Sequence, residues 1–576
     1  MTSTYTLGRT DHRVTTATAT AKGGAARMVL VTLATSQFLM TLDSSVMNVS
    51  MATVASDVGT TITGIQTAIT LYTLVMATLM ITGGKIGTII GRRRAFAIGC
   101  IIYACGSFVT GIAQNLPTLI IGWSLLEGVG AALIMPAIVA LVAANFEAKE
   151  RPRAYGLIAA AGAIAVAVGP LLGGACTTYL SWRYVFFGEV VIVLVILALS
   201  RRIQDAVPDK GVKIDFVGTV LSIAGLGLFV YGVLRSSEWG WVLPKPGGTA
   251  IFGLSPTFWL IAIGLFIVWL FIMWEKRMVR LDKEPLVRPV MFKNVQLTGG
   301  LIMFFFQFML QAGIFFVVPL FLSVVLELSA IDTGLRIMPL SVALLAAAVL
   351  IPKFWPDANP RRVVRIGIFF MLCGILVLMS GIDINATAAV VAIPMLLIGL
   401  GIGSLASQLG AVTVSAVPTK ESGEVGGLQN TATNLGASLG TALAGSVLIA
   451  VLTTSLIAGI QTNPQVPADV KTQASTQLAS GVPFLSDTQL TKAMKDAGAT
   501  TQVTNAVVAE NQKARIAGLD VALGVLALLA MLSLFFSGRI PTSQPSGDTP
   551  LDDEAGADEA VATVVRSTSD DATDME

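Results

Sequence analysis

Charged residues are scarce in this chain of 576 residues: Asp, Glu, Lys and Arg together make up only 12%, whereas 54% of the residues are hydrophobic. A soluble domain typically carries about 25% charged residues. So apolar a chain needs an apolar solvent, because each membrane-crossing helix requires roughly 20 mostly apolar residues. The scarcity of charge therefore excludes an ordinary soluble protein and indicates an integral membrane protein.

Histidine and cysteine are also scarce. The single histidine is His12, and the four cysteines, Cys100, Cys105, Cys176 and Cys373, form no Cys-x-x-Cys pair. Because zinc sites are built mainly from these two residue types, a zinc hydrolase is excluded, and we expect neither a metal site nor a cofactor. No cluster of a nucleophile with a base is evident, so we expect a protein that is not an enzyme.

Long apolar runs recur along the chain, separated by short polar breaks. They are too long for the alternating strands of a β-barrel and predict membrane-spanning α-helices. The first run is too long for a cleaved signal peptide, so we expect it to be retained. The fourteen predicted spans are 28–48, 65–84, 95–113, 118–143, 154–175, 183–200, 214–235, 256–274, 297–321, 333–352, 363–381, 387–411, 430–457 and 516–536.

Basic residues lie in alternate breaks between these spans, which tests the helix number. Most of the 37 Lys and Arg residues fall on one side if the N-terminus is cytoplasmic. Cytoplasmic loops carry an excess of these residues, and a wrong helix number would scramble the alternation. The pattern predicts a multi-pass protein of the plasma membrane with both termini in the cytoplasm.

Two segments are predicted to lie outside the membrane. Residues 458–515 form an outer loop, in which 486–497 and 500–513 have the composition of short surface helices. The acidic C-terminal tail has no aromatic residue and is predicted to be disordered. The predicted domains are a cytoplasmic leader at 1–27, a six-helix bundle at 28–200, a linker with two extra helices at 201–296, a second six-helix bundle at 297–537 and the tail at 538–576.

The turn between the second and third spans reads Gly84-Lys-Ile-Gly-Thr-Ile-Ile-Gly-Arg-Arg-Arg94. Its glycines allow a tight turn, and its arginines can hold helix C-termini or an anionic partner across the molecule. A basic turn that only fixes topology is the alternative. The candidate conformational residues of this turn are Gly84, Gly87, Gly91, Arg92, Arg93 and Arg94.

This turn resembles the signature loop of the major facilitator superfamily, Gly-x-Leu-x-Asp-Arg-x-Gly-Arg-Lys. Thr88 stands at the Asp position and Ile89 at the first Arg position, so the resemblance implies a hinge more than a charge relay. The first span ends in Leu42-Asp-Ser-Ser-Val-Met-Asn-Val49, which is similar to a motif of the fourteen-helix drug:proton antiporter branch. The resemblance extends over most of the chain.

The fifth span is similar to the glycine–proline signature of antiporters in the same superfamily. It reads Gly162-Ala-Ile-Ala-Val-Ala-Val-Gly-Pro-Leu-Leu-Gly-Gly174. Missing side chains at Gly169, Gly173 and Gly174 would let helices approach closely. Pro170 removes a backbone hydrogen bond and predicts a kink. The resemblance implies two six-helix bundles that rock about a midplane site, with two extra helices inserted between them, in a protein that functions as a monomer.

Three acidic residues, Asp43, Glu127 and Glu189, are predicted to lie inside spans. Carboxylates in a membrane are costly, so they are candidates for function. No Lys or Arg is evident at matching depth. The fourth span, Trp123-Ser-Leu-Leu-Glu-Gly-Val-Gly-Ala-Ala132, resembles a family pattern that has an arginine at Ser124 and a glutamine at Glu127. Burial without a cation favours the protonated form of a carboxyl group, so we expect the three acids to couple transport to protons. The alternatives are a helix-end position for Asp43 and an aqueous rim position for Glu189.

Aromatic and amide side chains are the candidates for a substrate cavity. A mostly apolar wall with a few hydrogen-bonding groups suits amphipathic molecules. Packing against lipid and hydrogen bonds between helices would explain the same residues equally well. The candidate cavity residues are Asn48, Tyr72, Phe304, Gln307, Phe308, Gln311, Gln429, Asn430 and Asn434.

The sequence thus predicts a secondary transporter with a major facilitator fold. Its expected function is proton-coupled export of hydrophobic or amphipathic compounds, cationic or lipid-like, by alternating access. Export of an envelope lipid or of one dedicated metabolite is one alternative, and a non-transporting scaffold or sensor is another. The expected partners are a small substrate, protons and the lipid bilayer, and no nucleic acid.

Overall fold

The regular secondary structure of the described residues is helical. Among these residues the computed structural model has one isolated β-bridge, between Ile251 and Leu254, and no longer strand. The predicted all-α membrane fold is confirmed. The residues that the structure describes are 11–60, 62–147, 149–205, 213–245, 248–384, 386–418, 421–468, 470–472, 478, 482 and 484–544.

The helices follow the apolar runs of the sequence. Those of the first half are α1 (Asp11–Asp57), α2 (Ile62–Ile90), α3 (Arg92–Gly111), α4 (Leu116–Leu119), the π-helix η1 (Ile120–Glu127), α5 (Gly128–Asn145), α6 (Arg151–Tyr179), α7 (Arg183–Ser200), α8 (Phe216–Trp239) and α9 (Pro256–Arg280). Those of the second half are η2 (Pro289–Lys293), α10 (Val295–Leu320), η3 (Phe321–Val325), α11 (Ala330–Phe354), α12 (Pro360–Gly381), η4 (Ala388–Val391), α13 (Ala392–Val414), α14 (Ser422–Thr462), α16 (Asp487–Asp496), α17 (Thr501–Phe536) and η6 (Ser537–Arg539).

Every predicted span coincides with one of these helices, or with abutting helices, to within a few residues. Among the described residues, thirteen helices are long and apolar enough to cross a membrane. The remaining predicted span, 154–175, lies within α6, which packs against α1 and α11. Apolar length therefore located the spans, because each run has to match the thickness of the bilayer.

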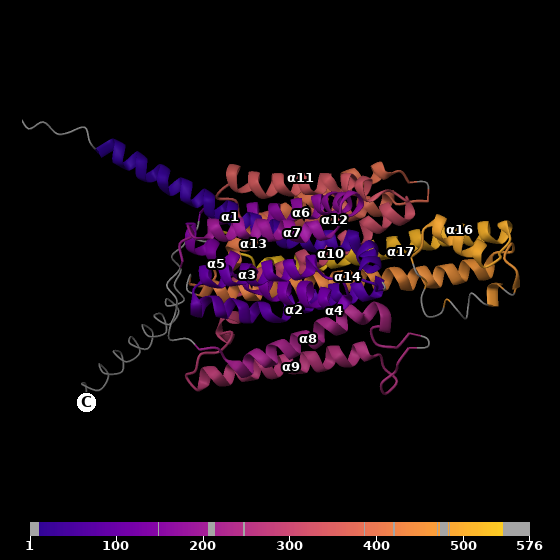
Figure 1. Cartoon of the computed structure of the whole chain (residues 1–576), viewed down its shortest axis with the longest axis horizontal. Helices are drawn as coiled ribbons and strands as arrows, with labels where there is room; N and C mark the ends of the chain where they lie inside the picture. Colours follow the sequence, from indigo (N-terminus) through magenta and orange to yellow (C-terminus); the bar gives the residue numbers. More distant parts are fainter. Residues whose placement is uncertain are drawn as a thin grey trace, which may run out of the picture.

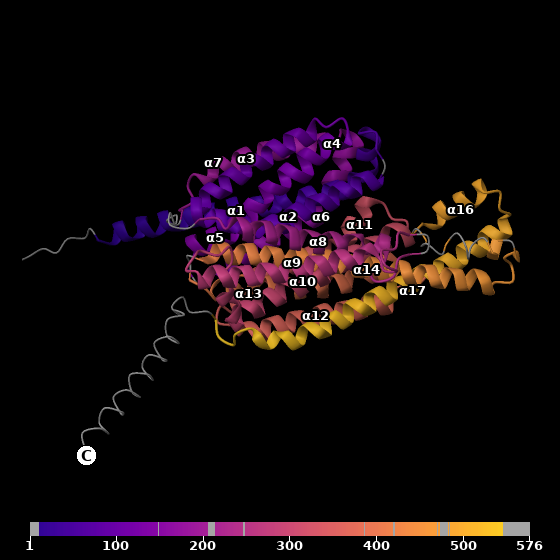
Figure 2. The same ribbon diagram turned by 90° about the horizontal axis from the view of Figure 1, so that it is seen from below.

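The helices gather into two groups, which Figure 2 shows on opposite sides of the molecule. Helices α1–α7 pack mainly on one another, as do α10–α14 with α17. Between the groups, α2 and α5 contact α14, and α6 contacts α11 and α13. The two extra helices, α8 and α9, pack together at one flank, where α8 lies against α2 and α14 (Figure 1).

The two ends of the helix assembly differ. At one end Lys85 of α2 bonds to Glu424 of α14, and Arg93 of α3 donates to the carbonyl oxygen of Arg201, just past α7. We call this the basic end, and the predicted topology places it in the cytoplasm. Helix α14 begins there, and at about 1.5 Å per residue its 41 residues carry it past the opposite end, where it projects with α16 and α17 (Figure 1).

Helices extend beyond the predicted spans at the leader and at the outer loop. Helix α1 begins at Asp11, inside the predicted leader, and residues 500–513 form the first turns of α17 instead of a separate helix. The short helix expected at 486–497 is present as α16. Hydropathy marks where contact with lipid ends. A helix continues for as long as its backbone hydrogen bonds do, so a helix can be longer than its membrane span.

The projecting part has an apolar core of its own, which explains why it is ordered. Its members come from α14, α17 and the segment between them: Leu452, Leu456, Ile460, Val466, Val482, Val503, Ala506, Val507 and Ala514. The beginning of the predicted disordered tail is also held in place, since Arg361 donates to the carbonyl oxygen of Ile540 at 2.7 Å. The rest of that tail, from 545, and residues 1–10 lie outside the described residues.

Candidate functional site

The three predicted intramembrane acids meet in one buried cluster, although they come from α1, the end of η1 and α7. One carboxylate oxygen of each of Asp43, Glu127 and Glu189 lies within 4.8 Å of those of the other two. All three side chains are buried, and Glu189 is 1% exposed. The rim position considered for Glu189 is therefore wrong. So is the helix-end position for Asp43, because α1 continues to Asp57.

Asp43 is held by an indole. Nε1 of Trp123 donates to both carboxylate oxygens of Asp43, at 2.8 and 3.0 Å. Tyr72 stacks on Trp123 with ring centroids 5.0 Å apart, and both rings are buried. Tyr72 was predicted to line the substrate cavity, but it supports the acid cluster instead. Stacking on Trp123 inside the first bundle stabilises this position of the ring.

The two glutamates are held by hydroxyl groups. Thr110 donates to Oε1 of Glu127 at 3.1 Å. Ser107 and Tyr103 donate to Oε2 of Glu189 at 3.2 and 3.4 Å. The other oxygens, Oε2 of Glu127 and Oε1 of Glu189, are buried without a hydrogen-bond partner. The cluster therefore has unused capacity to bind a proton or a cation.

The cluster contains no ion pair among the described residues. Ser124, at the position where the resemblance implies an arginine, donates at 2.8 Å to the carbonyl oxygen of Ala68 on α2. Like charges this close in a low-dielectric interior cannot all persist. The cluster must keep its net charge low by taking up protons or a cation, which is what a coupling site requires.

Local backbone geometry makes room for Glu127. It ends the π-helix η1, a rare conformation that occurs frequently at functional sites. A Cβ atom on Gly106 of α3 would lie 2.6 Å from Cγ of Glu127, so only glycine fits there. Neither feature can be read from hydropathy, since η1 and α3 look like ordinary apolar segments.

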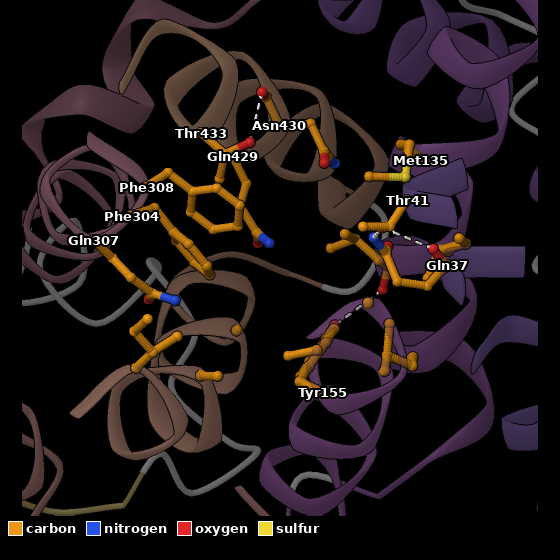
Figure 3. A pocket seen from close by; sticks show the side chains of 18 of the residues that line it. Gln37, Thr41, Met135, Tyr155, Phe304, Gln307, Phe308, Gln429, Asn430 and Thr433 are labelled. Carbon is orange, nitrogen blue, oxygen red and sulfur yellow. Dashed lines mark hydrogen bonds between the residues drawn. The ribbon is translucent and has the colours of Figure 1, made fainter. Parts of the chain in front are cut away.

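A cavity lies between the two helix groups (Figure 3). Six predicted cavity residues line it: Phe304, Gln307, Phe308, Gln311, Gln429 and Asn430. Asn434 does not, since its amide donates to Sδ of Met80 and to the carbonyl oxygen of Asn430. The side chain of Asn48 lies outside the described residues.

The sequence analysis missed one wall of this cavity. Gln37 and Thr41 of α1, Met135 of α5 and Tyr155 of α6 form this wall, and Thr433 lines the cavity from α14, beside Gln429 and Asn430 (Figure 3). Gln37 and Thr41, two polar residues inside the first predicted span, could have been used to predict this wall.

The acid cluster is not part of this cavity wall. Asp43 lies only two residues after Thr41, but successive helical residues turn by about 100°. The two side chains therefore point to nearly opposite sides of α1. Helix α1 thus connects the two sites, with the cavity on one face and the acids on the other.

Two residues that the sequence analysis missed join the helix groups at the basic end. Nζ of Lys85 lies 2.7 Å from Oε1 of Glu424, and their side chains are only 1% and 5% exposed. The two helices approach so closely there that a Cβ atom on Gly84 would strike the carbonyl oxygen of Gly423. The sequence did contain a signal for this pair: a lysine at the end of one apolar run and a glutamate in the first turn of another helix.

Arg93 of the same turn acts locally. The side chain of Arg93 donates to the carbonyl oxygens of Arg201 at 3.2 Å and Ile203 at 3.4 Å, just past the C-terminus of α7. Its backbone N–H donates to Asp205. Holding a helix C-terminus was one of the two predicted roles. The partner across the molecule is bound by Lys85 instead.

Comparisons with known proteins decide the family. The model described as Major Facilitator Superfamily matches residues 33–244 and 217–441. The chain belongs to this superfamily. The puromycin resistance protein pur8 of Streptomyces alboniger is 28% identical over 73% of this chain and 81% of its own length. The cephamycin export protein CmcT of Amycolatopsis lactamdurans is 29% identical over 74% and 85%.

Solved structures agree with the fold. The human organic anion transporter MFSD10 aligns with a TM-score of 0.55 at 11% identity, covering 89% of this chain and 99% of its own. The proton:xylose symporter XylE aligns with a TM-score of 0.52 at 14% identity, covering 91% and 98%. The predicted superfamily, its drug-efflux relatives and the transporter fold are confirmed.

The glycine–proline signature of this superfamily member brings α6 against α1. A Cβ atom on Gly169 would strike the side chain of Ser45, and one on Gly173 would lie 3.1 Å from Cα of Val46. Gly174 was predicted to act in the same way, but nothing lies within 4 Å of its Cβ position. Gly162 lines the cavity. Helix α6 is continuous through Pro170, whose side chain lies outside the described residues.

Exchange of Gly169 for Leu is expected to abolish transport and leave the protein in the membrane. The added side chain would push α6 from α1, which costs helix packing but not insertion. Substrate uptake and membrane abundance should be measured together, with Gly174→Leu as the matched control. Wild-type transport by a normally expressed Gly169→Leu variant would show that this contact has no role.

Proposed function

We propose that the protein exports hydrophobic or amphipathic compounds, including antibiotic-like molecules, in exchange for protons. The buried cluster of Asp43, Glu127 and Glu189 carries the proposal, because it has unpaired oxygens and no cationic partner. Relatives named for puromycin resistance and cephamycin export support the direction and the substrate class. The protein acts as a monomer in the plasma membrane.

The central cavity supplies the substrate site. Phe304 and Phe308 of α10 offer apolar surface, while Gln307 of α10 and Gln429 and Asn430 of the neighbouring α14 offer hydrogen-bonding groups (Figure 3). Such a lining holds molecules with a large apolar body and a few polar groups. The site therefore accepts substrates of many shapes, provided that each has a large apolar body and only a few polar groups.

Helices shared by the two sites couple them. Helix α1 carries both Asp43 and the cavity residue Thr41, and the continuous η1–α5 segment carries both Glu127 and the cavity residue Met135. Protonation of the cluster removes repulsion between the acids and lets α1 and η1 pack more closely. A substrate in the cavity acts on the same two helices from their other face.

Alternating access requires that the basic end opens. In the described conformation this end is closed, since the Lys85–Glu424 ion pair is buried and Gly156 of α6 packs on the backbone of Ala348 of α11. Opening exposes the ion pair to water, where its attraction weakens as the desolvation cost of the two charges is recovered. Because the lost attraction and the recovered hydration offset each other, the closed and open conformations of the basic end are close in free energy.

Uptake into inverted membrane vesicles tests this function. An acidic interior should drive accumulation of a lipophilic probe such as puromycin, and a protonophore should abolish it. Uptake that ignores the imposed pH gradient would rule out proton coupling. No uptake of any apolar probe would instead favour the scaffold or sensor alternative.

Both termini and the basic end are proposed to be cytoplasmic, with α16 outside. Cysteine labelling in a variant without the four native cysteines checks this. A cysteine at exposed Arg94 should react only from the cytoplasm, and one at exposed Lys492 only from outside. The reverse pattern, or labelling of both positions from one side, would contradict the topology.

A further inference from the structure

The wall of the central cavity has no charged side chain. Among the described residues that line it there is no Asp, Glu, Lys, Arg or His. Its polar side chains carry amides and hydroxyls and belong to Gln37, Thr41, Tyr155, Gln307, Gln311, Gln429, Asn430 and Thr433. Figure 3 shows most of these side chains around the cavity. Amides and hydroxyls exchange hydrogen bonds with a ligand, but they do not neutralise a full charge.

The acids of the buried cluster do not supply the missing charge. Asp43 and Glu127 are 0% exposed and Glu189 is 1% exposed. None of the three lines the cavity, and Asp43 lies on the face of α1 nearly opposite Thr41. A cation bound in the cavity therefore has no direct contact through which it could replace a proton on the cluster.

The charged neighbours of one cavity residue, Tyr155, are positive. Its hydroxyl donates to the carbonyl oxygen of Val139 at 2.9 Å, which fixes the ring in the wall. Its electrostatic neighbours are Arg151 and Arg92. Arg151 is held at the C-terminus of α5, where it donates to the carbonyl oxygen of Ala143 at 2.9 Å. These fixed cations repel a second cation, so this side of the cavity is a poor site for a positive group.

The aromatic residues of the wall do not replace a counter-charge. Phe304 and Phe308 lie one turn apart on α10, so both rings belong to the same side of the cavity. The aromatic cages that bind quaternary ammonium groups surround the cation, and Trp attracts a cation more strongly than Phe does. An ammonium group in this cavity would lose its water and recover only part of the cost.

We propose that the central cavity binds and releases uncharged molecules, and that export is therefore electrogenic. This inference rests on the proton exchange proposed above. When a neutral substrate leaves and protons enter, each cycle moves one positive charge inward for every proton exchanged. A basic compound is carried in its neutral form, and the proton that it has lost stays in the cytoplasm. The membrane potential then drives export together with the pH gradient.

Equilibrium binding to the full-length protein in phospholipid nanodiscs tests the preference for uncharged molecules. The probes are three dansyl sulfonamides whose side arms end in a neutral tert-butyl group, its cationic isostere trimethylammonium, or an anionic sulfonate. After subtraction of binding to empty nanodiscs, the tert-butyl compound should bind about tenfold more tightly than either charged compound, because it loses less hydration. Equal or tighter binding of the cation or the anion would overturn the proposal.

Gln311→Glu supplies a counter-charge from a half-buried position in the cavity wall. In alkaline buffer it should strengthen binding of the trimethylammonium compound about tenfold, since a carboxylate then faces the cation. Retained binding of the tert-butyl compound shows that the variant is folded. Gln114→Glu, the same change at an exposed residue outside the cavity, is the matched control. A folded Gln311→Glu variant that still rejects the cation would overturn the proposal.

Inverted vesicles separate this proposal from proton-coupled export itself. Uptake of the tert-butyl compound is measured with an acidic interior or, at equal pH, with an inward K⁺ gradient and valinomycin, which make the interior positive. A potential of about 100 mV should sustain up to about fifty-fold accumulation for each proton exchanged. Uptake that follows the pH gradient but not the potential would overturn the proposal and leave proton-coupled export intact. Uptake that follows neither gradient would overturn both.

Discussion

Exchange of Asp43 for Asn is expected to reduce gradient-driven export to the level of empty vesicles. Asparagine keeps an oxygen to accept the indole N–H of Trp123, so the cluster should stay packed. It cannot take up or release a proton, however, so the coupling step is lost. Substrate uptake under an imposed pH gradient and equilibrium substrate binding should be measured on the same preparation. Binding of a neutral substrate should persist.

The other two acids should contribute unequally. Glu127→Gln restores the residue that the resemblance associates with this position, so its effect should be milder than that of Asp43→Asn. The double variant should show no response to pH. Asp57→Asn is the matched control, because it makes the same change on α1 at a partly exposed ion pair with Arg183, which contributes little.

Two outcomes would contradict this coupling scheme. A double variant that still concentrates substrate in response to a pH gradient would show that neither Asp43 nor Glu127 carries the coupling proton. Carboxylate oxygens this close can also ligate a metal ion. Wild-type transport that follows an imposed Na⁺ or Mg²⁺ gradient at constant pH would therefore assign the cluster to a cation instead of a proton.

Exchange of Gly84 for Val is expected to abolish transport by preventing closure of the basic end. A Cβ atom there would meet the carbonyl oxygen of Gly423 and lie 3.4 Å from Cα of Gly427. These are backbone atoms, which cannot turn aside as a side chain does. The ion pair between Lys85 and Glu424, one residue further along both helices, would be pulled apart. Folding of each helix group should be unaffected.

Accessibility of the central cavity distinguishes a trapped conformation from simple loss of the protein. A cysteine at Thr41 in the Gly84→Val background should react from the cytoplasm and no longer from outside. Gly87→Ala is the matched control, because its Cβ position is an ordinary 3.7 Å from Cβ of Ala95. Wild-type transport by Gly84→Val, or labelling of Thr41→Cys from both sides, would contradict the role of this contact.

The sequence by itself determined the spans, the family and the three acids that form the buried cluster. Span length depends only on the thickness of the bilayer, so an apolar run of the right length can be recognised one helix at a time. An acid inside such a run costs free energy in whichever direction its side chain points. Asp43, Glu127 and Glu189 could therefore each be recognised separately. The glycines were readable too, because close helix contact requires missing side chains.

Only the tertiary structure decided which of these residues meet. A helix that is apolar nearly all round gives no hydropathy signal for its rotation about its own axis. The sequence therefore could not bring Glu189 to the cluster, turn Tyr72 away from the cavity, or pair Lys85 with Glu424 across 339 positions. The π-helix before Glu127 adds a further local rotation. Side-chain packing between helices sets these rotations, and it exists only once the bundles have assembled.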